Sequence, residues 1–315
     1  MPLQLDPDLA AALVAGAAAS AAIPTPARGD ALTLRGITDQ TLTALLAQAP
    51  AAAEVDVANF SAIADDGTNV RLRWYTRNRD APGSAIVYIH GGGMICGSLD
   101  IYEPLVRHYV QRTGVPFLAV DYRLAPEFPG TTPAEDSFAA LKWLLGNASE
   151  LAVNPERVAL MGDSAGGGIG AGVAILARDH GLHLARQILV YPMLDDRNIE
   201  PDSALDATAT WTYDNNYTGW HALLGDEIGT PTVSPVAAPA RLANFTDLPP
   251  TYIEVGELDI FRDEAIDYAR SLLRDGVSCE LHVLAGAPHA HDLLGMTLQI
   301  GQQSLDERVR VIASI

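Results

Sequence analysis

The sequence is poor in cysteine and in lysine, and each shortage excludes a class of protein. It contains 2 cysteines in 315 residues, Cys96 and Cys279, which are too few for a disulfide framework. We therefore expect two reduced, buried thiols. Lys142 is the only lysine, and the formal net charge is −19. Nucleic-acid binding needs a basic stripe, and no cluster of lysine and arginine supplies one, so a nucleic-acid partner is not expected.

Long apolar runs are missing as well. No stretch reaches the ~20 apolar residues that a bilayer-spanning helix needs, which argues against stable membrane anchoring. The alanine-rich stretch from Leu9 to Ala22 follows Asp6 and Asp8 without a basic segment, so it resembles a helix more than a signal peptide. We therefore predict a cytoplasmic protein. Its apolar content of 48% suffices for one large core with a cap.

Glycine, in contrast, is plentiful, and the most informative glycines flank a serine. Ser164 lies within Gly162-Asp163-Ser164-Ala165-Gly166, directly after the apolar run 157–161. A nucleophilic hydroxyl needs room for a base, so it must stand on a tight turn, and neighbouring glycines relieve the crowding there. The small residues 166–172 can begin a helix whose N-terminus faces developing negative charge. The pattern predicts a nucleophile elbow; the alternative is a glycine-rich turn without a catalytic role.

A second glycine-rich segment, His90-Gly91-Gly92-Gly93, follows the apolar run 85–89. Acyl transfer places negative charge on a carbonyl oxygen, and consecutive glycines let backbone N–H groups approach that oxygen. A flexible glycine turn would explain neither the leading histidine nor the position after a strand. We predict an oxyanion hole formed by the backbone of Gly91, Gly92, Gly93 and Ala165.

A serine nucleophile also needs a base and a carboxylate that orients it, and in one large class of hydrolases these follow in the order serine, acid, histidine. Asp259 and His289 satisfy that order, each directly after a predicted strand. Glu257 is close enough to exchange roles with Asp259, and His291 competes with His289. The two histidines could also chelate a metal with Asp292, but no third imidazole or cysteine lies at ligand spacing, so no metal site is predicted.

Strand and helix patterns alternate along the chain, which indicates an α/β fold with a mostly parallel central sheet and helices on both faces. An antiparallel hairpin is expected first, over 54–62 and 69–76. Further strands are expected near 85–89, 115–120, 157–161, 187–191, 250–255 and 279–284. Helices are expected over 99–113, 133–146, 166–178, 262–275 and 292–312.

The segment 195–244 interrupts this alternation and is rich in aromatic residues. A long insertion between core strands is usually functional when it is ordered. We predict a mainly helical cap built from 1–50 and 195–244, with the catalytic core in 51–194 and 245–315. The candidates for substrate binding in this cap are Trp211, Tyr213, Tyr217 and Trp220; alternatively, they only pack the cap onto the core.

Together the HGGG segment at 90–93 and the GDSAG segment at 162–166 resemble the hormone-sensitive-lipase family of α/β-hydrolase esterases. The likeness extends over most of the chain, including 120–127 and 256–264. It implies an α/β-hydrolase fold, and it supports Asp259 over Glu257 as the acid. The family's histidine segment matches Pro288-His289-Ala290, while His291 takes a place where an aromatic residue is commoner, so its role stays open.

The resemblance implies a serine carboxylesterase that hydrolyses short to medium acyl esters through Ser164, Asp259 and His289 and a covalent acyl-enzyme, without a metal or organic cofactor. Its expected partner is a small-molecule ester, and the family likeness is compatible with a homodimer. Two other functions stay open at this point. One is amide or peptide hydrolysis by the same triad, and the other is a non-catalytic receptor for a small molecule, like the plant gibberellin receptors that resemble this family.

Overall fold

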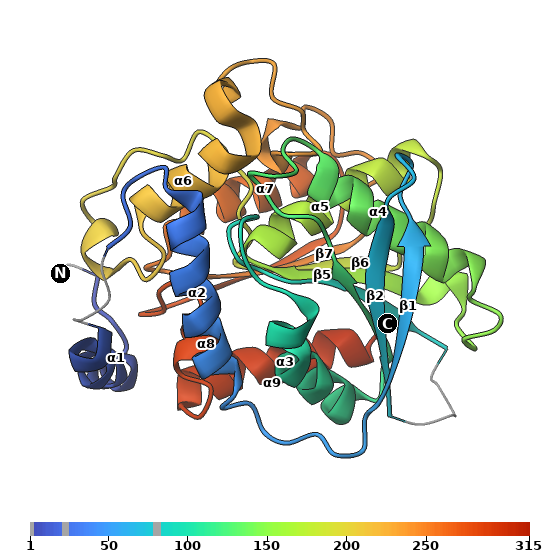
Figure 1. The fold of residues 1–315 in the computed structure, drawn as a ribbon, viewed down its shortest axis with the longest axis horizontal. Helices are drawn as coiled ribbons and strands as arrows, with labels where there is room; N and C mark the ends of the chain where they lie inside the picture. The colour runs from blue at the N-terminus through green and yellow to red at the C-terminus, as the bar shows by residue number, and fades with distance from the viewer. Residues whose placement is uncertain (1–2, 21–24, 78–82) are drawn as a thin grey trace.

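A computed structural model describes residues 3–20, 25–77 and 83–315 of the chain (Figure 1). Within these ranges one sheet has the strand order β1-β2-β4-β3-β5-β6-β7-β8. Strands β3 to β8 run parallel, whereas β1 and β2 are antiparallel to their neighbours, which confirms the predicted mostly parallel sheet. The strands are β1 (Asp56–Ile63), β2 (Asn69–Thr76), β3 (Ala85–Ile89), β4 (Phe117–Asp121), β5 (Val158–Asp163), β6 (Arg186–Val190), β7 (Thr251–Gly256) and β8 (Cys279–Leu284).

The first two strands form the predicted hairpin. Asp56 pairs with Thr76 at its open end, and Ile63 pairs with Asn69 at the turn. In the turn, Gly67 has a φ of +86°, a conformation that glycine adopts without steric cost. The strand signals of alternating polarity therefore located both arms of this hairpin to within two residues.

Helices cover both faces of the sheet. Helices α4, α5 and α7 lie on one face and α3 and α9 on the other (Figure 1). Because both sides are covered, the central strands β3, β5 and β7 are buried along their whole length. These helices are α3 (Leu99–Thr113), α4 (Thr132–Gly146), α5 (Ala165–Asp179), α7 (Arg262–Arg274) and α9 (Gln299–Ala313).

The prediction of one continuous helix over 292–312 is wrong. The structure has a short helix α8 (His291–Leu294), a turn, and then α9. The break is stabilised by two glycines, because a Cβ on Gly301 would lie 2.1 Å from the carbonyl oxygen of Gly295. The bare backbone at Gly301 thus lets α9 pack directly against the turn, and α8 begins two residues after His289.

The segments predicted to form a cap contribute three helices, α1 (Pro7–Ser20), α2 (Ala31–Leu46) and α6 (Tyr213–Leu224). Helix α2 packs against α6, α3 and α8. Residues 1–2 and 21–24 of the segment 1–50 lie outside the described residues. Short 3-10 helices complete the described elements, at Pro155–Arg157, Asp206–Thr208, Gly225–Glu227 and Pro239–Arg241.

Two of the predictions drawn from what the sequence lacks can be compared with the structure. None of the helices that the structure describes combines the length and the apolarity that crossing a bilayer requires. Both cysteines are free, and Cys96 is buried as expected. Cys279 is only half-buried because it lies on β8, the edge strand of the sheet.

Candidate active site

Ser164 occupies the sharp turn between β5 and α5. Its φ of 56° and ψ of −122° are rare for a residue with a side chain, so the turn is strained. Three backbone hydrogen bonds hold it. The Ser164 N–H donates to the Val190 carbonyl at 2.8 Å, and the Ser164 carbonyl accepts from the N–H groups of Met193 and Gly168 at 3.0 and 3.1 Å. A Cβ on Gly166 would lie 2.0 Å from the Ile89 carbonyl, which explains the glycine after the serine.

The structure brings Ser164, His289 and Asp259 into one hydrogen-bonded line. His289 Nε2 lies 3.0 Å from Ser164 Oγ, and His289 Nδ1 lies 2.8 Å from Asp259 Oδ2. The other carboxylate oxygen of Asp259 accepts the Phe261 N–H at 2.9 Å, and its side chain is fully buried. Three loops, after β5, β7 and β8, thus converge as the order of the residues in the sequence predicted.

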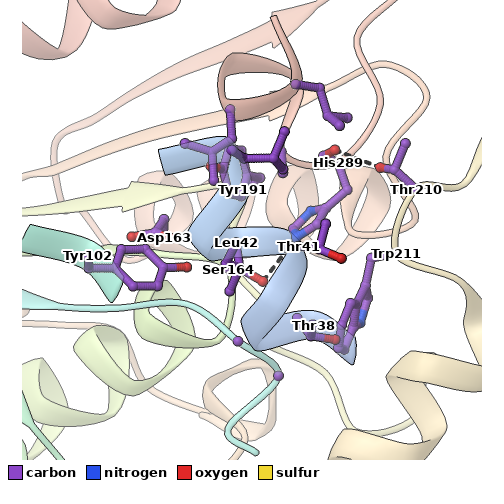
Figure 2. Close-up of a pocket in the computed structure, with 16 residues that line it drawn as sticks. Thr38, Thr41, Leu42, Tyr102, Asp163, Ser164, Tyr191, Thr210, Trp211 and His289 are labelled. Carbon is purple, nitrogen blue, oxygen red and sulfur yellow. Dashed lines mark hydrogen bonds between the residues drawn. The ribbon is translucent and has the colours of Figure 1, made fainter. Parts of the chain in front are cut away.

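Packing fixes the plane of the His289 ring. Tyr191 and Phe261 contact it edge-on, with ring centroids 4.8 and 4.9 Å away. The Thr210 hydroxyl donates to the His289 carbonyl at 2.6 Å, and Figure 2 shows this bond and the one to Ser164 as dashed lines. The imidazole is therefore held between Ser164 and Asp259 before any substrate binds.

Neither of the rival residues reaches this line. Glu257 accepts the Gly286 N–H at 3.1 Å instead of contacting His289. His291 is buried and its Nε2 lies 2.8 Å from Ser304 Oγ. Burial lowers the pKa of His291, so its imidazole is neutral, and its place in the structure is that of a packing residue behind Tyr191.

The glycine loop after β3 lies beside Ser164. Gly92 and Gly93 have φ values of +121° and +58° and line the cavity at the serine. A Cβ on Gly92 would lie 2.2 Å from the Cys96 carbonyl, and one on Gly91 would lie 2.7 Å from Asp163 Oδ2. Neither position therefore has room for a side chain. Ala165 is the first residue of α5, where the helix dipole is positive.

His90, the residue before the three glycines, anchors this loop in the protein core. Its ring is buried and stacked between Tyr102 and Tyr122, with centroids 5.3 and 4.3 Å away. Nδ1 lies 2.8 Å from the Gly91 carbonyl, which requires a proton on that nitrogen. Burial lowers the pKa of His90, which keeps the ring neutral. The sequence motif located the histidine but not the two tyrosines that hold it.

A cavity of about 130 Å³ opens above the serine, with a predominantly apolar lining. Among the predicted aromatic residues, Trp211 lines it, and Tyr213, Tyr217 and Trp220 are not among its lining residues. Trp220 and Tyr213 are buried, and Tyr217 stacks on His221. The lining comprises Thr38, Thr41, Leu42, Leu45, Gly92, Gly93, Tyr102, Asp163, Ser164, Tyr191, Thr210, Trp211, His289, Ala290, Leu293 and Leu294.

The prediction of a cap in 1–50 named none of the α2 residues that line this cavity. Figure 2 shows Thr38, Thr41 and Leu42 on this helix, close to Ser164 and His289. Their spacing of three and four residues places them on one face of a helix. That pattern could have been found in the sequence, although nothing in it says that this face is turned toward the serine.

A second missed feature is a group of buried charges behind His289. The Arg308 guanidinium donates to Asp292 Oδ2 at 2.5 Å and also to Glu254, and each of these three side chains is 1% exposed. The Tyr191 hydroxyl donates to the other oxygen of Asp292 at 2.9 Å. Although burial alone would raise it, the Arg308 charge holds the pKa of Asp292 below its usual range. This chain of contacts leads from Arg308 to the Tyr191 ring that contacts His289.

Asp163, directly before the serine, is a further buried carboxylate. The Tyr88 hydroxyl donates to its Oδ1 at 2.5 Å. Burial raises the pKa of Asp163 to about 6, and the nearby charge of Asp292 contributes to the shift. The site therefore contains a second buried carboxyl group, with a raised pKa, outside the hydrogen-bonded line.

One group of side chains in the described part of the chain could hold a metal ion. Ligand atoms of Glu280, His282 and Glu307 lie within 4.8 Å of one another on β8 and α9. The Arg310 guanidinium donates to both carboxylates, so these two groups already share one cation. In the triad loop, His289 and His291 bind different partners and do not converge on a common point with Asp292.

A hydroxyl, an imidazole and a carboxylate in line, on loops of a mostly parallel sheet, define a serine-hydrolase site on an α/β-hydrolase fold. A family model described as alpha/beta hydrolase fold matches residues 86–293, which include all three side chains. The chain belongs to this family, in its hormone-sensitive-lipase group of esterases, as the sequence motifs predicted.

Individual relatives agree with this membership. The chain is 38% identical over 225 residues to the carboxylesterase NlhH of Mycobacterium tuberculosis, covering 67% of each chain. It is 30% identical over 262 residues to an ethyl acetate hydrolase of Pseudomonas putida, covering 79% of this chain and 80% of that one. The structure of a bacterial heroin esterase superposes with a TM-score of 0.90 at 36% identity, covering 99% of this chain and 98% of that one. The chain is a carboxylic ester hydrolase.

Proposed function

We propose that this carboxylesterase cleaves short to medium acyl esters with Ser164 as nucleophile, through a covalent acyl-enzyme. The observation that carries the proposal is the line of two hydrogen bonds, 3.0 and 2.8 Å long, that joins Ser164 to His289 and His289 to Asp259. A serine hydroxyl is a weak nucleophile until a base removes its proton, and the imidazole lies at the distance that this transfer needs.

Each group has one task in the reaction. His289 Nε2 takes the proton of Ser164 as Oγ attacks the ester carbonyl, and it then delivers that proton to the leaving alcohol. Asp259 Oδ2 accepts a hydrogen bond from the Nδ1–H of His289 and so fixes the tautomer of the ring. Backbone N–H groups of the loop 91–93 and of Ala165 stabilise the oxyanion. Water, deprotonated by the same imidazole, then hydrolyses the acyl-enzyme.

The cavity supports the proposed size of the acyl group. Its volume of about 130 Å³ suits a short chain, and its apolar walls favour a hydrocarbon over a charged group. The similarity to an ethyl acetate hydrolase points in the same direction. We further propose that 1–50 and 195–244 form a cap over the catalytic core, because α2 and Trp211 supply much of this lining.

A panel of p-nitrophenyl esters from acetate to dodecanoate tests the proposal, with Ser164→Ala as the control. We expect the highest kcat/KM at short to medium chains and a sharp decline beyond them. An organophosphonate should label the Ser164 peptide, as detected by mass spectrometry, and the absence of labelling would indicate a receptor. A p-nitroanilide matched to the preferred acyl chain tests the amidase alternative, which predicts an equal or higher rate on the anilide.

The homodimer and the cytoplasmic location stay predictions. Light scattering coupled to size exclusion would measure the mass in solution against the 33.4 kDa of one chain. Fractionation of the source cells would test the location.

A further inference from the structure

One face of α2 contacts two parts of the site at once. Arg35, Thr38, Asp39 and Leu42 follow one another at spacings of three, one and three, so they share that face. Thr38 and Leu42 line the cavity beside Ser164, as Figure 2 shows. Arg35 and Asp39 instead contact the loop that carries Gly92 and Gly93. The same helix face therefore lines the substrate cavity and supports the glycine loop.

Arg35 connects three segments of the chain. Its Nε donates to the Ile95 carbonyl at 2.5 Å, and its Nη2 donates to the Ala125 carbonyl at 2.7 Å. Both terminal nitrogens also donate to the carboxylate of Glu127, at 2.8 and 2.6 Å. The Ala125 N–H in turn donates to the Met94 carbonyl at 3.0 Å. The guanidinium thus joins α2 to the glycine loop and to the loop after β4.

Asp39 holds the far end of the same loop. Its Oδ1 accepts the Gly97 N–H at 2.8 Å. Gly97 has a φ of +94°, and a Cβ there would lie 2.5 Å from His90 Nδ1, so the loop is tightly placed at this point. Within the loop, the Gly92 carbonyl accepts the Ile95 N–H at 3.0 Å. A movement of Ile95 or Gly97 would therefore move Gly92.

We propose that Arg35 and Asp39 are positioning residues that couple the docking of α2 to the geometry of the oxyanion hole. The docked helix holds the backbone N–H groups of Gly92 and Gly93 in place for every ester, whatever acyl group packs against Thr38 and Leu42. This inference rests on the proposed function, in which these N–H groups stabilise the oxyanion. Oxyanion stabilisation is sensitive to such placement, because each donor must lie close to the developing charge.

The hydrogen bonds from Arg35 to backbone carbonyls should contribute more to kcat than its ion pair with Glu127. Glu127 is 47% exposed, and ion pairs with exposed partners contribute little. Arg35 itself is 22% exposed, and its Nε and Nη2 reach backbone carbonyls that a shorter or uncharged side chain cannot bind in the same way. Glu127→Gln should accordingly have a much smaller effect than Arg35→Met.

The test measures kcat and KM for Arg35→Met and Arg35→Lys on p-nitrophenyl acetate, butyrate and hexanoate. We expect Arg35→Met to lower kcat about 10- to 100-fold, by the same factor on all three esters, with KM changed less than about threefold. Arg35→Lys should lower kcat by a smaller factor, because lysine keeps the positive charge but lacks the planar set of donors of the guanidinium. Inhibition by a trifluoromethyl ketone, which forms a tetrahedral oxyanion on the serine, should weaken in parallel with kcat/KM.

Arg77→Met is the matched control. The Arg77 guanidinium also binds one carboxylate, of Glu54, and one backbone carbonyl, of Gln111, but it lies at the end of β2. Its kinetics should equal those of the wild type. An unchanged kcat in a folded Arg35→Met variant, or a rise in KM that grows with acyl length at constant kcat, would show that α2 is only a wall of the cavity and would overturn the inference.

A pair of substitutions at Asp39 decides the matter independently if Arg35→Met does not fold. Asp39→Asn keeps an oxygen that accepts the Gly97 N–H, so kcat should stay near the wild-type value. Asp39→Ala removes the acceptor and should lower kcat without a dependence on acyl length; equal kinetics of the two variants would contradict the proposal. Failure of the proposed function would look different, because Ser164→Ala would then keep its turnover and the phosphonate would not label Ser164.

Discussion

The two halves of the active site are held in different ways. On the base side, His289 contacts Tyr191, and Tyr191 is held by a group of charges from the core in which Arg308, Asp292 and Glu254 are each 1% exposed. On the side of the proposed oxyanion hole, called the oxyanion side below, the glycine loop is held by α2, which belongs to neither of the helix layers that cover the sheet. The contact runs through Arg35 at 22% and Glu127 at 47% exposure. Contacts among buried groups open only when much of the fold opens, whereas partly exposed contacts open at lower cost.

Because of this difference, mutations in the two halves should affect different quantities, the free energy of unfolding in one and kcat in the other. Removing one member of a buried charge group leaves an uncompensated charge in the core, which destabilises the whole fold. Removing a partly exposed contact costs the fold little but changes the position of groups in the site. The base side should therefore respond to mutation mainly through unfolding, and the oxyanion side mainly through kcat.

The largest expected effect is on kcat and comes from removing Ser164 Oγ, which lies between the two halves of the site. Ser164→Ala removes the nucleophile while leaving the base and the oxyanion loop in place, so kcat on p-nitrophenyl butyrate should fall at least about 1,000-fold. Thermal unfolding should change little, which shows that the variant is folded. A turnover within tenfold of the wild type would end the assignment of Ser164.

Arg308→Met tests the base side. It leaves Asp292 and Glu254 buried without their cation, and we expect a loss of about 3–5 kcal/mol in the free energy of unfolding, measured by urea denaturation. Arg270→Met, at an arginine that is 78% exposed, is the control and should change stability by less than about 0.5 kcal/mol. If Arg308→Met and Arg35→Met destabilise the fold equally, the contrast between the two halves is wrong.

Asp163 lies between the halves, beside Gly91 on one side and the charge of Asp292 on the other. Burial raises its pKa from 3.8 to about 6, so between these values the folded protein holds a proton that the unfolded chain has released. The free energy of unfolding therefore falls progressively as pH rises from 4 to 6, and at higher pH this loss remains constant. The variant Asp163→Asn has a side chain that is neutral at every pH, so it does not show this loss.

Urea denaturation of both proteins at pH 4, 5, 6 and 7 measures this effect. The stability of Asp163→Asn relative to the wild type should rise by about 2–3 kcal/mol across the interval and then level off. A difference that is constant with pH would mean that Asp163 ionises in the fold as it does in the unfolded chain.

The smallest expected effect concerns the wall of the oxyanion side. Trp211 lines the cavity and approaches Gly93 closely, since a Cβ on that glycine would lie 2.6 Å from the indole ring. Trp211→Ala should shift the ratio of kcat/KM for hexanoate over acetate by about tenfold toward the longer ester. Tyr217→Ala, which changes a ring stacked on His221, should leave the ratio unchanged.

The parts of the site that local backbone geometry determines could be predicted from the sequence. The glycines around Ser164 and at 91–93 are required by positive φ values or by close backbone contacts, and such requirements leave a pattern in neighbouring residues. Asp259 and His289 could be placed because each follows a strand of a parallel sheet, and those ends share one edge.

Other parts depend on contacts between distant segments, which no local pattern encodes. Arg308 and Glu254 are 54 positions apart, and a charged residue on an amphipathic helix is usually expected to face water. The face of α2 that lines the cavity is recognisable only once the helix is seen docked. The break in the helix at Gly295 was not predicted. The need for glycine at position 301 arises from its contact with the Gly295 carbonyl, and this contact forms only in the folded turn.

Cys96 lies inside the loop that α2 supports, fully buried, with its sulfur 3.0 Å from the Gly92 carbonyl. Burial raises the pKa of its thiol, so almost none is present as the reactive thiolate at neutral pH. An alkylating reagent such as iodoacetamide can reach this sulfur only while the loop is open. The rate at which Cys96 is alkylated therefore reports how often the oxyanion loop leaves its place, and an ester or inhibitor that holds α2 down should slow that modification.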